Sequence, residues 1–309
     1  SPVFSRRLNF QGLSILPWEG RDGKGIEAKT KRKGCGLPIS YPQVTALSAG
    51  DIRSLKALVL SSSIRYSISR ELAELVRLFM EGFKNVPEIF DPWPEKYDQW
   101  FESPVGRLVR NYERELLLRL LKPERGEFIL DAGCGTGVFT TDFLEAGAKV
   151  VGLELSRPML SRAMVKNRGR RFLPVQGDMR NLPFAEASFD KAVSVTAIEF
   201  IEEAKVAVEE IFRVTKPGGI IVVATLNSLS PWAHRRGEAG KKGHPIFSHA
   251  LFRSPEEMAQ LSPVEGVIET AVHFQKTDDL DFAQKIEREG TERGLNTGAF
   301  IAACWKKPG

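Results

Sequence analysis

The chain has 309 residues, of which 42% are hydrophobic and 27% charged, and its formal net charge is +5 at pH 7. This length leaves room for one domain of about 200 residues and an additional segment. No apolar run approaches the roughly 18 residues that a membrane span needs, and no signal-peptide pattern opens the chain. We therefore expect a cytoplasmic protein with no membrane span, although the first residue is Ser1 and the native N-terminus is left open.

The N-terminal part differs in composition from the rest of the chain. Residues 1–56 contain ten Lys or Arg and four Asp or Glu, so they carry all of the excess positive charge. Residues 1–50 are rich in Gly, Pro and Ser and show no periodicity, which predicts an irregular basic arm. Its cluster Lys29-Thr30-Lys31-Arg32-Lys33 has two interpretations: contact with nucleic-acid phosphates, or a solvated arm. The second is favoured because few aromatic residues accompany the cluster for base stacking.

Residues 51–94 are predicted to form a helical accessory segment and a linker. Within it one helical face is apolar, formed by Leu72, Leu75, Val76, Phe79 and Phe83. The prolines between residues 87 and 94 predict the linker into a third region, residues 95–309. This last region is expected to be the catalytic domain.

The third region begins with a helix and then a buried strand that ends in a glycine loop. Ser103 is expected to cap a helix that Pro104 opens and that runs to residue 121, with Leu108, Tyr112, Leu116 and Leu120 on its inner face. Residues 128–130 are an apolar run that suits a strand buried on both faces, and the strand is expected to end in the acid Asp131. The glycines that follow, Gly133, Gly135 and Gly137, allow a tight turn and a close approach to a ligand. Residues 138–144 then predict a helix whose free N–H groups face that ligand.

Strands and helices alternate through the rest of the region. Further strands are predicted at residues 149–154, 172–176 and 189–195, and helices after Ser156 and at residues 202–214. This order favours a mostly parallel sheet with helices on both faces. Because an open α/β sheet binds ligands beyond the carboxyl ends of its strands, Asp131, Glu154, Asp178 and Thr196 are expected to share one site.

The glycine loop does not have the nicotinamide fingerprint. That fingerprint is G-x-G-x-x-G, whereas the register here is G-x-G-x-G, with Val138 at the place of the third glycine. Glu154 ends the next strand, 17 positions after Gly137, where a carboxylate can accept both hydroxyls of a ribose. Asp178 and Met179 follow the third strand.

Taken together, residues 97–305 resemble a class I S-adenosylmethionine-dependent methyltransferase of the group that includes the ubiquinone and menaquinone methylases. The resemblance implies a Rossmann-like fold with a seven-stranded sheet, closed by an antiparallel pair at residues 271–274 and 298–305, and S-adenosyl-L-methionine as cofactor. The glycine loop would hold the methionine end of the cofactor, Glu154 the ribose, and Asp178 the adenine. The expected cofactor-binding residues are Asp131, Ala132, Gly133, Cys134, Gly135, Gly137, Glu154, Leu155, Asp178, Met179 and Thr196.

The chain departs from its relatives after the fourth strand. Thr196-Ala197-Ile198-Glu199-Phe200 stands where a Leu-His-His type of sequence is common. Glu199 is a candidate to orient or deprotonate the acceptor, and the alternative is a helix-start carboxylate stabilised by the helix dipole. A base is needed only if the acceptor arrives protonated.

Residues 227–253 are predicted to be a long loop next to the acceptor. The loop contains Arg235, Arg236, Lys241 and Lys242, and it is interpreted either as a lid that selects an anionic acceptor or as a solvated loop. Its three histidines lack metal-ligand spacing, and the cysteines Cys35, Cys134 and Cys304 are scattered, so we expect no metal site and no disulfide framework.

The sequence thus predicts methyl transfer to a small or medium-sized acceptor. Two alternatives stay open: an RNA or protein methyltransferase that docks through the basic arm, and a non-catalytic methyltransferase-like assembly subunit. The identity of the acceptor, the methylated atom and the oligomeric state do not follow from the sequence.

Overall fold

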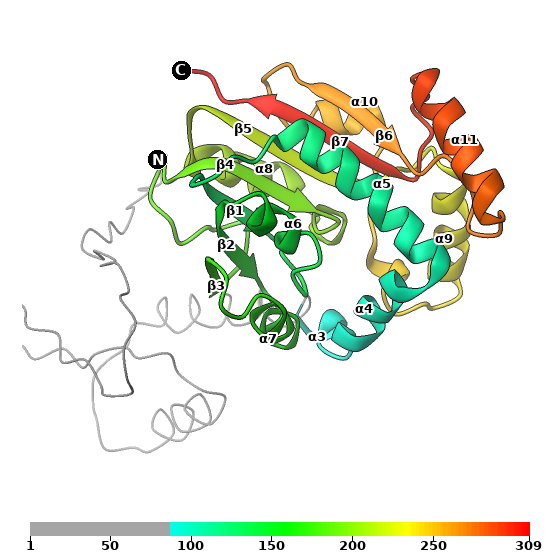
Figure 1. Ribbon diagram of the computed structural model, residues 1–309, viewed down its shortest axis with the longest axis horizontal. Helices are drawn as coiled ribbons and strands as arrows, with labels where there is room; N and C mark the ends of the chain where they lie inside the picture. Colours follow the sequence, from blue (N-terminus) through cyan, green and yellow to red (C-terminus); the bar gives the residue numbers. More distant parts are fainter. Residues whose placement is uncertain (1–86) are drawn as a thin grey trace, which may run out of the picture. The chain divides into compact units, whose positions relative to one another are not determined.

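The computed structural model describes residues 87–309 (Figure 1). The predictions for the basic arm, its cluster at residues 29–33 and the apolar helix face at residues 72–83 lie outside the described residues. Within residues 87–309, no helix is long and apolar enough to cross a membrane.

The described residues form one seven-stranded sheet with the strand order β3-β2-β1-β4-β5-β7-β6. The strands are β1 (Phe128–Ala132), β2 (Lys149–Glu154), β3 (Phe172–Gln176), β4 (Phe189–Val195), β5 (Thr215–Leu226), β6 (Val267–Ala271) and β7 (Phe300–Lys306). Strands β1 to β5 pair in parallel, and β7 is antiparallel to both β5 and β6. The predicted fold class and the presence of a closing antiparallel pair are confirmed. The bounds of the first strand of that pair were wrong, because β6 is Val267–Ala271 and not residues 271–274, whereas β7 (Phe300–Lys306) overlaps the predicted residues 298–305.

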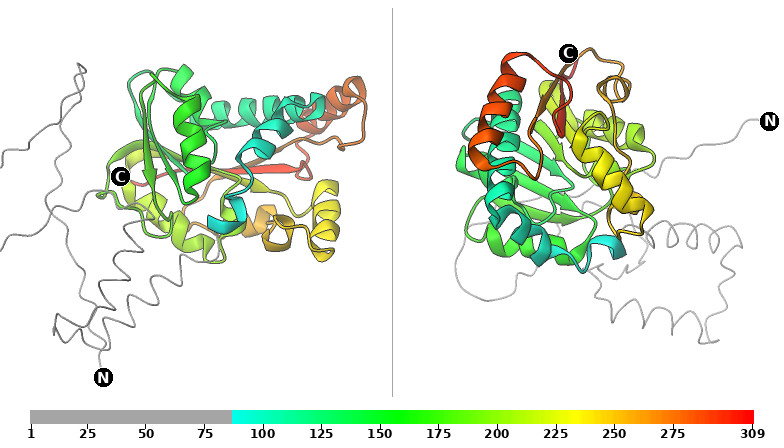
Figure 2. Two further views of the ribbon diagram at one scale, coloured as in Figure 1. Left: turned by 90° about the horizontal axis from the view of Figure 1, so that it is seen from below. Right: turned by 90° about the vertical axis from the view of Figure 1, so that its right-hand side faces the viewer.

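Helices cover both faces of the sheet. They are α3 (Pro87–Phe90), α4 (Pro94–Glu102), α5 (Pro104–Leu121), α6 (Thr140–Glu145), α7 (Arg157–Lys166), α8 (Ala204–Val214), α9 (Pro231–Lys241), α10 (Pro255–Ala259) and α11 (Leu280–Glu292). Helices α5 and α11 lie on one face, and α8 and α10 on the other (Figure 2). Neighbouring residues of one strand alternate between the two cores, as Ile129 and Leu130 do, because strand side chains point to opposite faces in turn.

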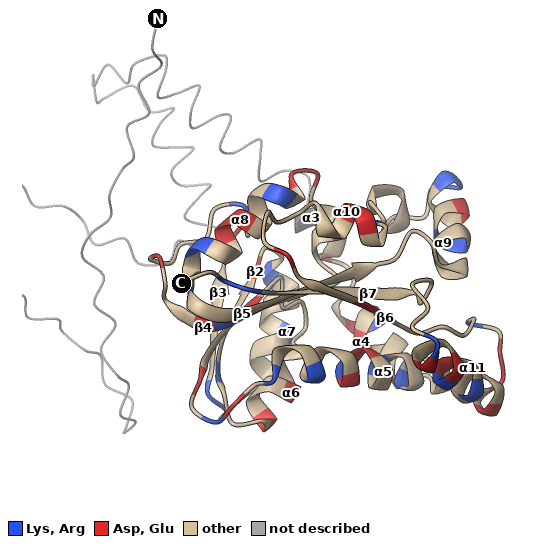
Figure 3. Cartoon of the chain, turned by 90° about the horizontal axis from the view of Figure 1, so that it is seen from above, with Lys and Arg blue, Asp and Glu red and all other residues tan. Residues whose placement is uncertain are grey.

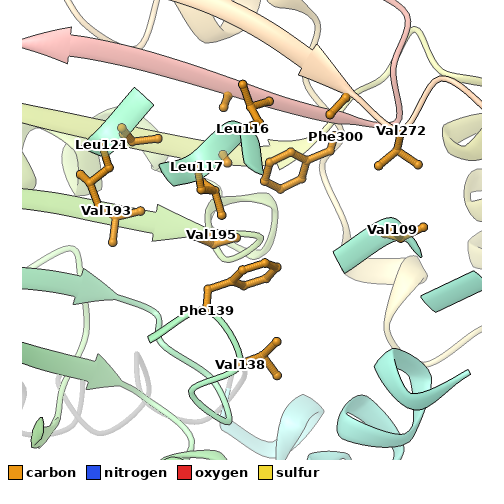
Figure 4. Packing of buried hydrophobic residues seen from close by; sticks show 14 of the residues in the cluster. Val109, Leu116, Leu117, Leu121, Val138, Phe139, Val193, Val195, Val272 and Phe300 are labelled. Atoms are coloured by element: carbon orange, nitrogen blue, oxygen red, sulfur yellow. The ribbon is translucent and has the colours of Figure 1, made fainter. Parts of the chain in front are cut away.

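Helix α5 begins as predicted, with the Ser103 side chain accepting a hydrogen bond from the Gly106 backbone N–H. Its buried face is formed by Val109, Glu113, Leu116, Leu117 and Leu121, and Figure 4 shows the apolar members of this face against Phe139 and Val195. Of the four residues predicted for this face, Leu116 is buried, whereas Leu108, Tyr112 and Leu120 are only partly buried and pack at the edge of the same core. The buried register contains the charged Glu113 in place of an apolar residue, so the apolar period alone favoured the neighbouring register.

Two segments predicted to lack regular structure are helical. The proposed linker at residues 87–94 contains α3 and the first residue of α4, and the proposed loop at residues 227–253 contains α9. Ser230 caps α9 by accepting from the Ala233 N–H, and Pro231 opens it. This is the same Ser-Pro signal that marks α5. It was overlooked because Gly237 and Gly240 weaken the helical pattern that follows.

Candidate functional site

A cavity of 390 Å³, here called cavity 1, opens at the carboxyl ends of β1, β2 and β4. Nine of the eleven sequence-predicted cofactor residues line it, namely Asp131, Gly133, Cys134, Gly135, Glu154, Leu155, Asp178, Met179 and Thr196. The two others do not: Ala132 is fully buried in the sheet, and Gly137 faces α7. The parallel strands therefore bring together side chains that lie far apart in the sequence.

The glycine loop has a conformation and a packing that only glycine allows. Gly133 has φ of 79°, and a Cβ there would lie 2.5 Å from the Ala197 Cβ. Gly137 has φ of 76°, and its Cβ would lie 2.7 Å from the Asn167 amide nitrogen. Gly133 thus keeps the floor of cavity 1 open, and Gly137 instead lets the loop pack against the end of α7.

Glu154 is held in place by backbone donors at the end of β2. Its Oε2 accepts from the Gly135 N–H at 2.9 Å, and its Oε1 accepts from the Ser156 N–H at 2.8 Å. Burial raises the pKa of Glu154, and the two N–H donors oppose that shift. The carboxylate therefore has a fixed orientation beside the glycine loop, with lone pairs remaining for a ligand.

The two aspartates of cavity 1 have different environments. Asp131 accepts from the Thr140 hydroxyl at 2.5 Å, and burial raises its pKa to about 7. Asp178 forms an ion pair with Arg180 at 2.6 Å. Some of the acceptor capacity of the Asp178 carboxylate is thus already used by Arg180, a residue of the same loop.

Helix α4 contributes two site residues that sequence analysis missed. Asp98 accepts from the Thr136 hydroxyl at 2.6 Å, from Arg162 Nε at 2.9 Å and from Lys166 Nζ at 2.7 Å. These bonds join α4 to the glycine loop and to α7. Tyr97 lines cavity 1 and also the cavity next to it. No local pattern marked either residue, because their partners lie roughly 40 to 70 positions away in the chain.

A second cavity of 550 Å³, cavity 2, adjoins cavity 1, and the two share Phe90, Tyr97, Thr196 and Phe200 as lining residues. The further aromatic residues of its wall are Trp93, Trp100, Phe101, Trp232 and Phe247. Aromatic walls of this kind bury apolar ligand surface and exclude water. The arrangement offers one compartment beside the glycine loop and one apolar compartment that meets it at Tyr97.

Four basic side chains line cavity 2. Arg235 and Arg236 lie over the Trp232 ring, Lys276 over Trp100 and Lys96 over Trp93, in each case within 4.7 to 5.0 Å of the ring centroid. The Nη1 nitrogen of Arg236 is buried and has no hydrogen-bond partner within residues 87–309. Burial lowers the pKa of Arg236 to about 10, so its guanidinium remains charged at neutral pH.

The four basic residues predicted to act in residues 227–253 separate into two pairs: Arg235 and Arg236 line cavity 2, and Lys241 and Lys242 lie elsewhere, so a lid that selects an anionic acceptor stays a prediction. Lys241 and Lys242 do not line either cavity, and Lys241 forms an ion pair with Glu238 at 2.9 Å. Figure 3 shows basic and acidic residues together on α9. Helical geometry separates the two pairs, because Arg235 and Arg236 come before the last turn of α9 and the lysines lie at its exposed end.

Glu199 lies in a short 3₁₀ helix (Ile198–Phe200) and lines cavity 2. Glu199 is thus a carboxylate in the first turn of this short helix and not of α8, which begins at Ala204, so both interpretations of Glu199 stay open. Glu199 is 1% exposed and accepts from the Thr225 hydroxyl at 2.9 Å. Burial raises its pKa to about 7.

Glu113 of α5, which the sequence did not mark, also lines cavity 2, and burial raises its pKa to about 8. Cavity 2 thus combines a guanidinium and two buried carboxyl groups with aromatic walls. Within the described part of the chain, no three His, Cys, Asp or Glu side chains gather as they would around a metal ion.

Comparisons with known proteins agree with this geometry. Residues 130–223 match the family described as a methyltransferase domain. The chain is 40% identical over 218 residues to malonyl-[acyl-carrier protein] O-methyltransferase from Pectobacterium atrosepticum, a match covering 60% of this chain and 85% of that protein. The protein of the same name from Erwinia pyrifoliae is 38% identical over 137 residues, which cover 41% of this chain and 52% of that protein.

Among solved structures, an S-adenosylmethionine-dependent methyltransferase from Thermotoga maritima is similar in fold. Its TM-score is 0.54 at 22% identity, and the match covers 72% of this chain and 99% of that one. The sequence relatives and the seven-stranded sheet lead to the same assignment. The chain belongs to the class I S-adenosylmethionine-dependent methyltransferases, and it is an enzyme that uses S-adenosyl-L-methionine as its cofactor.

Proposed function

We propose that the enzyme methylates a carboxylate oxygen of an acyl acceptor held in cavity 2, so that the product is a methyl ester. The observation that carries this proposal is the buried Arg236 Nη1 without a partner. A buried guanidinium N–H without a hydrogen-bond partner is costly, and the fork of guanidinium donors matches the geometry of a carboxylate. The names of the relatives, which act on a malonyl group, support an acceptor with a free carboxylate.

Cavity 1 is proposed as the cofactor compartment. Asp131 and the glycine loop would hold the methionine end, Glu154 the ribose hydroxyls, and Asp178 with the Met179 backbone the adenine. The absence of a Cβ at Gly133 supports this fit, because a side chain there would fill the cavity floor. The bound cofactor supplies an activated methyl group on a positively charged sulfur.

The protein residues then have to position the acceptor and exclude water. Tyr97, Thr196, Phe90 and Phe200 line both cavities, so the acceptor oxygen and the methyl carbon would meet among them. Attack of the acceptor carboxylate oxygen on the methyl carbon would form the ester bond, and the pair of the broken carbon–sulfur bond would remain on the sulfur of the departing cofactor product. No proton moves, so no general base is required.

Other predictions from the sequence stay predictions. The alternative of an RNA or protein acceptor depends on the cluster at residues 29–33, for which the structure describes nothing. The domain boundaries at residues 50 and 94 and a cytoplasmic location also stay predictions. A fully catalytic domain starting at residue 87, rather than 95, is our proposal, because α3 and α4 supply Phe90, Tyr97 and Asp98 to the site.

The test is methyl transfer from labelled cofactor to a malonyl thioester of pantetheine, with the acetyl thioester, which has no free carboxylate, as the negative acceptor. Methyl ester formation on the first alone is expected. Arg236→Gln should raise the acceptor KM about tenfold or more, since a charged hydrogen bond is worth roughly 1.5–3 kcal/mol. Lys242→Gln, which changes an exposed basic residue of the same segment, is the matched control. Equal KM values for both variants, or methyl transfer only to amines, would refute the proposal.

A further inference from the structure

We infer that cavity 2 binds the acceptor carboxylate together with one proton carried by Glu113, so that acceptor binding is coupled to proton uptake. This inference rests on the proposed function, and it assigns the protonated Glu113 as a hydrogen-bond donor that recognises the acceptor. Glu113 is a specificity residue in this scheme and transfers no proton to the substrate.

The geometry around Glu113 is that of a carboxyl group without a partner. Glu113 projects from the middle of α5, is 7% exposed and lines cavity 2. Within residues 87–309 its side chain makes no hydrogen bond and has no basic nitrogen within 4.0 Å. Arg236 lines the same cavity, and its Nη1 is also unpaired. The two groups therefore face a shared space that neither fills.

A count of buried charges shows why a proton is needed there. Lys96, Arg235 and Lys276 are exposed, so the cations that count here are Arg236 and the buried Arg253 beside Glu199. They contribute two positive charges, and Glu113 and Glu199 contribute two negative charges if both are ionised. An acceptor carboxylate would then be a third negative charge beside two cations. Protonation of Glu113 removes one of the negative charges and supplies an O–H that donates to the acceptor. Binding of the anion and binding of the proton thus favour each other.

The groups that face Glu113 and Glu199 come from every element around the cavity. They are Tyr97 on α4, Arg110 on α5, Arg235 and Arg236 on α9, Arg253 after the 3₁₀ helix (Phe247–His249), and Lys96, His244 and Lys276 on the cavity wall. Burial is the largest cause of the raised pKa of Glu113, about 8, and Glu199 raises it further, whereas Arg236 and Arg110 lower it. Glu113 is accordingly protonated at neutral pH before the acceptor enters.

Glu199 is the less suitable proton carrier of the two. Its Oε2 already accepts from the Thr225 hydroxyl, and Arg253 lowers its pKa through its charge. Arg253 itself donates to the Ile198 and Ile201 carbonyl oxygens and so stays close to Glu199. Glu199 is therefore expected to be the group that ionises first as the pH rises.

The acceptor KM should consequently depend on pH in one direction. Below pH 7 the KM of the malonyl thioester should be constant, because Glu113 holds its proton. Above the pKa of Glu113, near 8, the KM should rise about tenfold per pH unit, as one required proton is lost. A cationic amine acceptor would show the opposite trend, since an ionised Glu113 would favour it.

The decisive experiment compares the pH profile of this KM from pH 6 to 9 in three proteins at saturating cofactor. They are the wild type, Glu113→Gln, and Glu115→Gln, which changes an exposed glutamate of the same helix. Glu113→Gln should bind the acceptor at every pH without the rise, because its amide donates a hydrogen bond and does not titrate. Glu115→Gln should keep the wild-type profile.

A measurement on the wild type alone guards against misfolding of the variant. Calorimetry of the malonyl thioester binding to the protein with S-adenosylhomocysteine, in two buffers of different ionisation enthalpy, should show uptake of a large fraction of one proton at pH 8.5, where a carboxyl group with a pKa of about 8 is mostly ionised. No uptake, or a wild-type pH profile in Glu113→Gln, overturns the inference while leaving the proposed function intact. If the wild type forms no methyl ester at any pH, both are overturned.

Discussion

Replacing Glu154 by Gln should weaken cofactor binding without changing the shape of the site. Glu154 uses one oxygen for the Gly135 N–H and the other for the Ser156 N–H. Gln has nearly the same size but only one accepting oxygen, so its NH₂ group must face one of these two donors. The substitution therefore leaves one backbone N–H of the loop unpaired and removes a charged acceptor for the ribose hydroxyls.

Both losses can be estimated. An unpaired buried donor costs about 1–3 kcal/mol, and a hydrogen bond to a charged group is worth roughly 1.5–3 kcal/mol. The unpaired N–H destabilises the folded protein with or without cofactor, so it should lower the melting temperature. The lost acceptor for the ribose hydroxyls weakens only the complex with the cofactor. Since about 1.4 kcal/mol is tenfold in affinity, the cofactor Kd should increase roughly tenfold to a hundredfold.

The assay is calorimetric titration with S-adenosylhomocysteine, accompanied by thermal melting of the free protein. Glu203→Gln is the matched control, because Glu203 also lines cavity 1 but its side chain is 55% exposed and paired with Arg180. The control should bind nearly as well as the wild type. An unchanged Kd in Glu154→Gln would show that Glu154 only braces the glycine loop, and the ribose assignment would then be wrong.

Two further predictions concern helix α4 and the start of the domain. Asp98→Asn should lower the melting temperature and weaken binding of S-adenosylhomocysteine. The substitution removes the charge that pairs with Arg162 and Lys166 and so weakens the attachment of α4 to the glycine loop. Melting curves and Kd values equal to those of the wild type would contradict this prediction. A protein containing residues 87–309 should fold and bind the cofactor, as measured by calorimetry. A protein that starts at residue 103 should bind the cofactor weakly or aggregate, since it lacks the α4 side of both cavities. Equal binding by the two proteins would show that α4 is dispensable.

The sequence alone determined the sheet and the cofactor side of the site. Strands buried on both faces are continuous apolar runs, and each is followed directly by the loop residues that reach the ligand. Gly133, Glu154 and Asp178 were therefore recognisable from their own neighbours, and the rule that ligands bind at the carboxyl ends of parallel strands placed them in one site. Nine of the predicted residues line cavity 1 because their positions could be recognised from the adjoining sequence.

On the acceptor side the sequence named Arg235, Arg236 and Glu199 as candidates, but which residues join them was decided only by the tertiary structure. Tyr97, Glu113, Arg236 and Lys276 come from four separate segments and meet only in cavity 2. Nothing near Glu113 in the sequence distinguishes it from an exposed glutamate such as Glu115, because the face of α5 that is buried depends on how that helix packs on the sheet. That packing places Glu113 in the wall of cavity 2. A residue whose role depends on packing between distant elements has no recognisable pattern in its neighbouring sequence. A residue that ends a buried strand has one, because the apolar run before it marks its place.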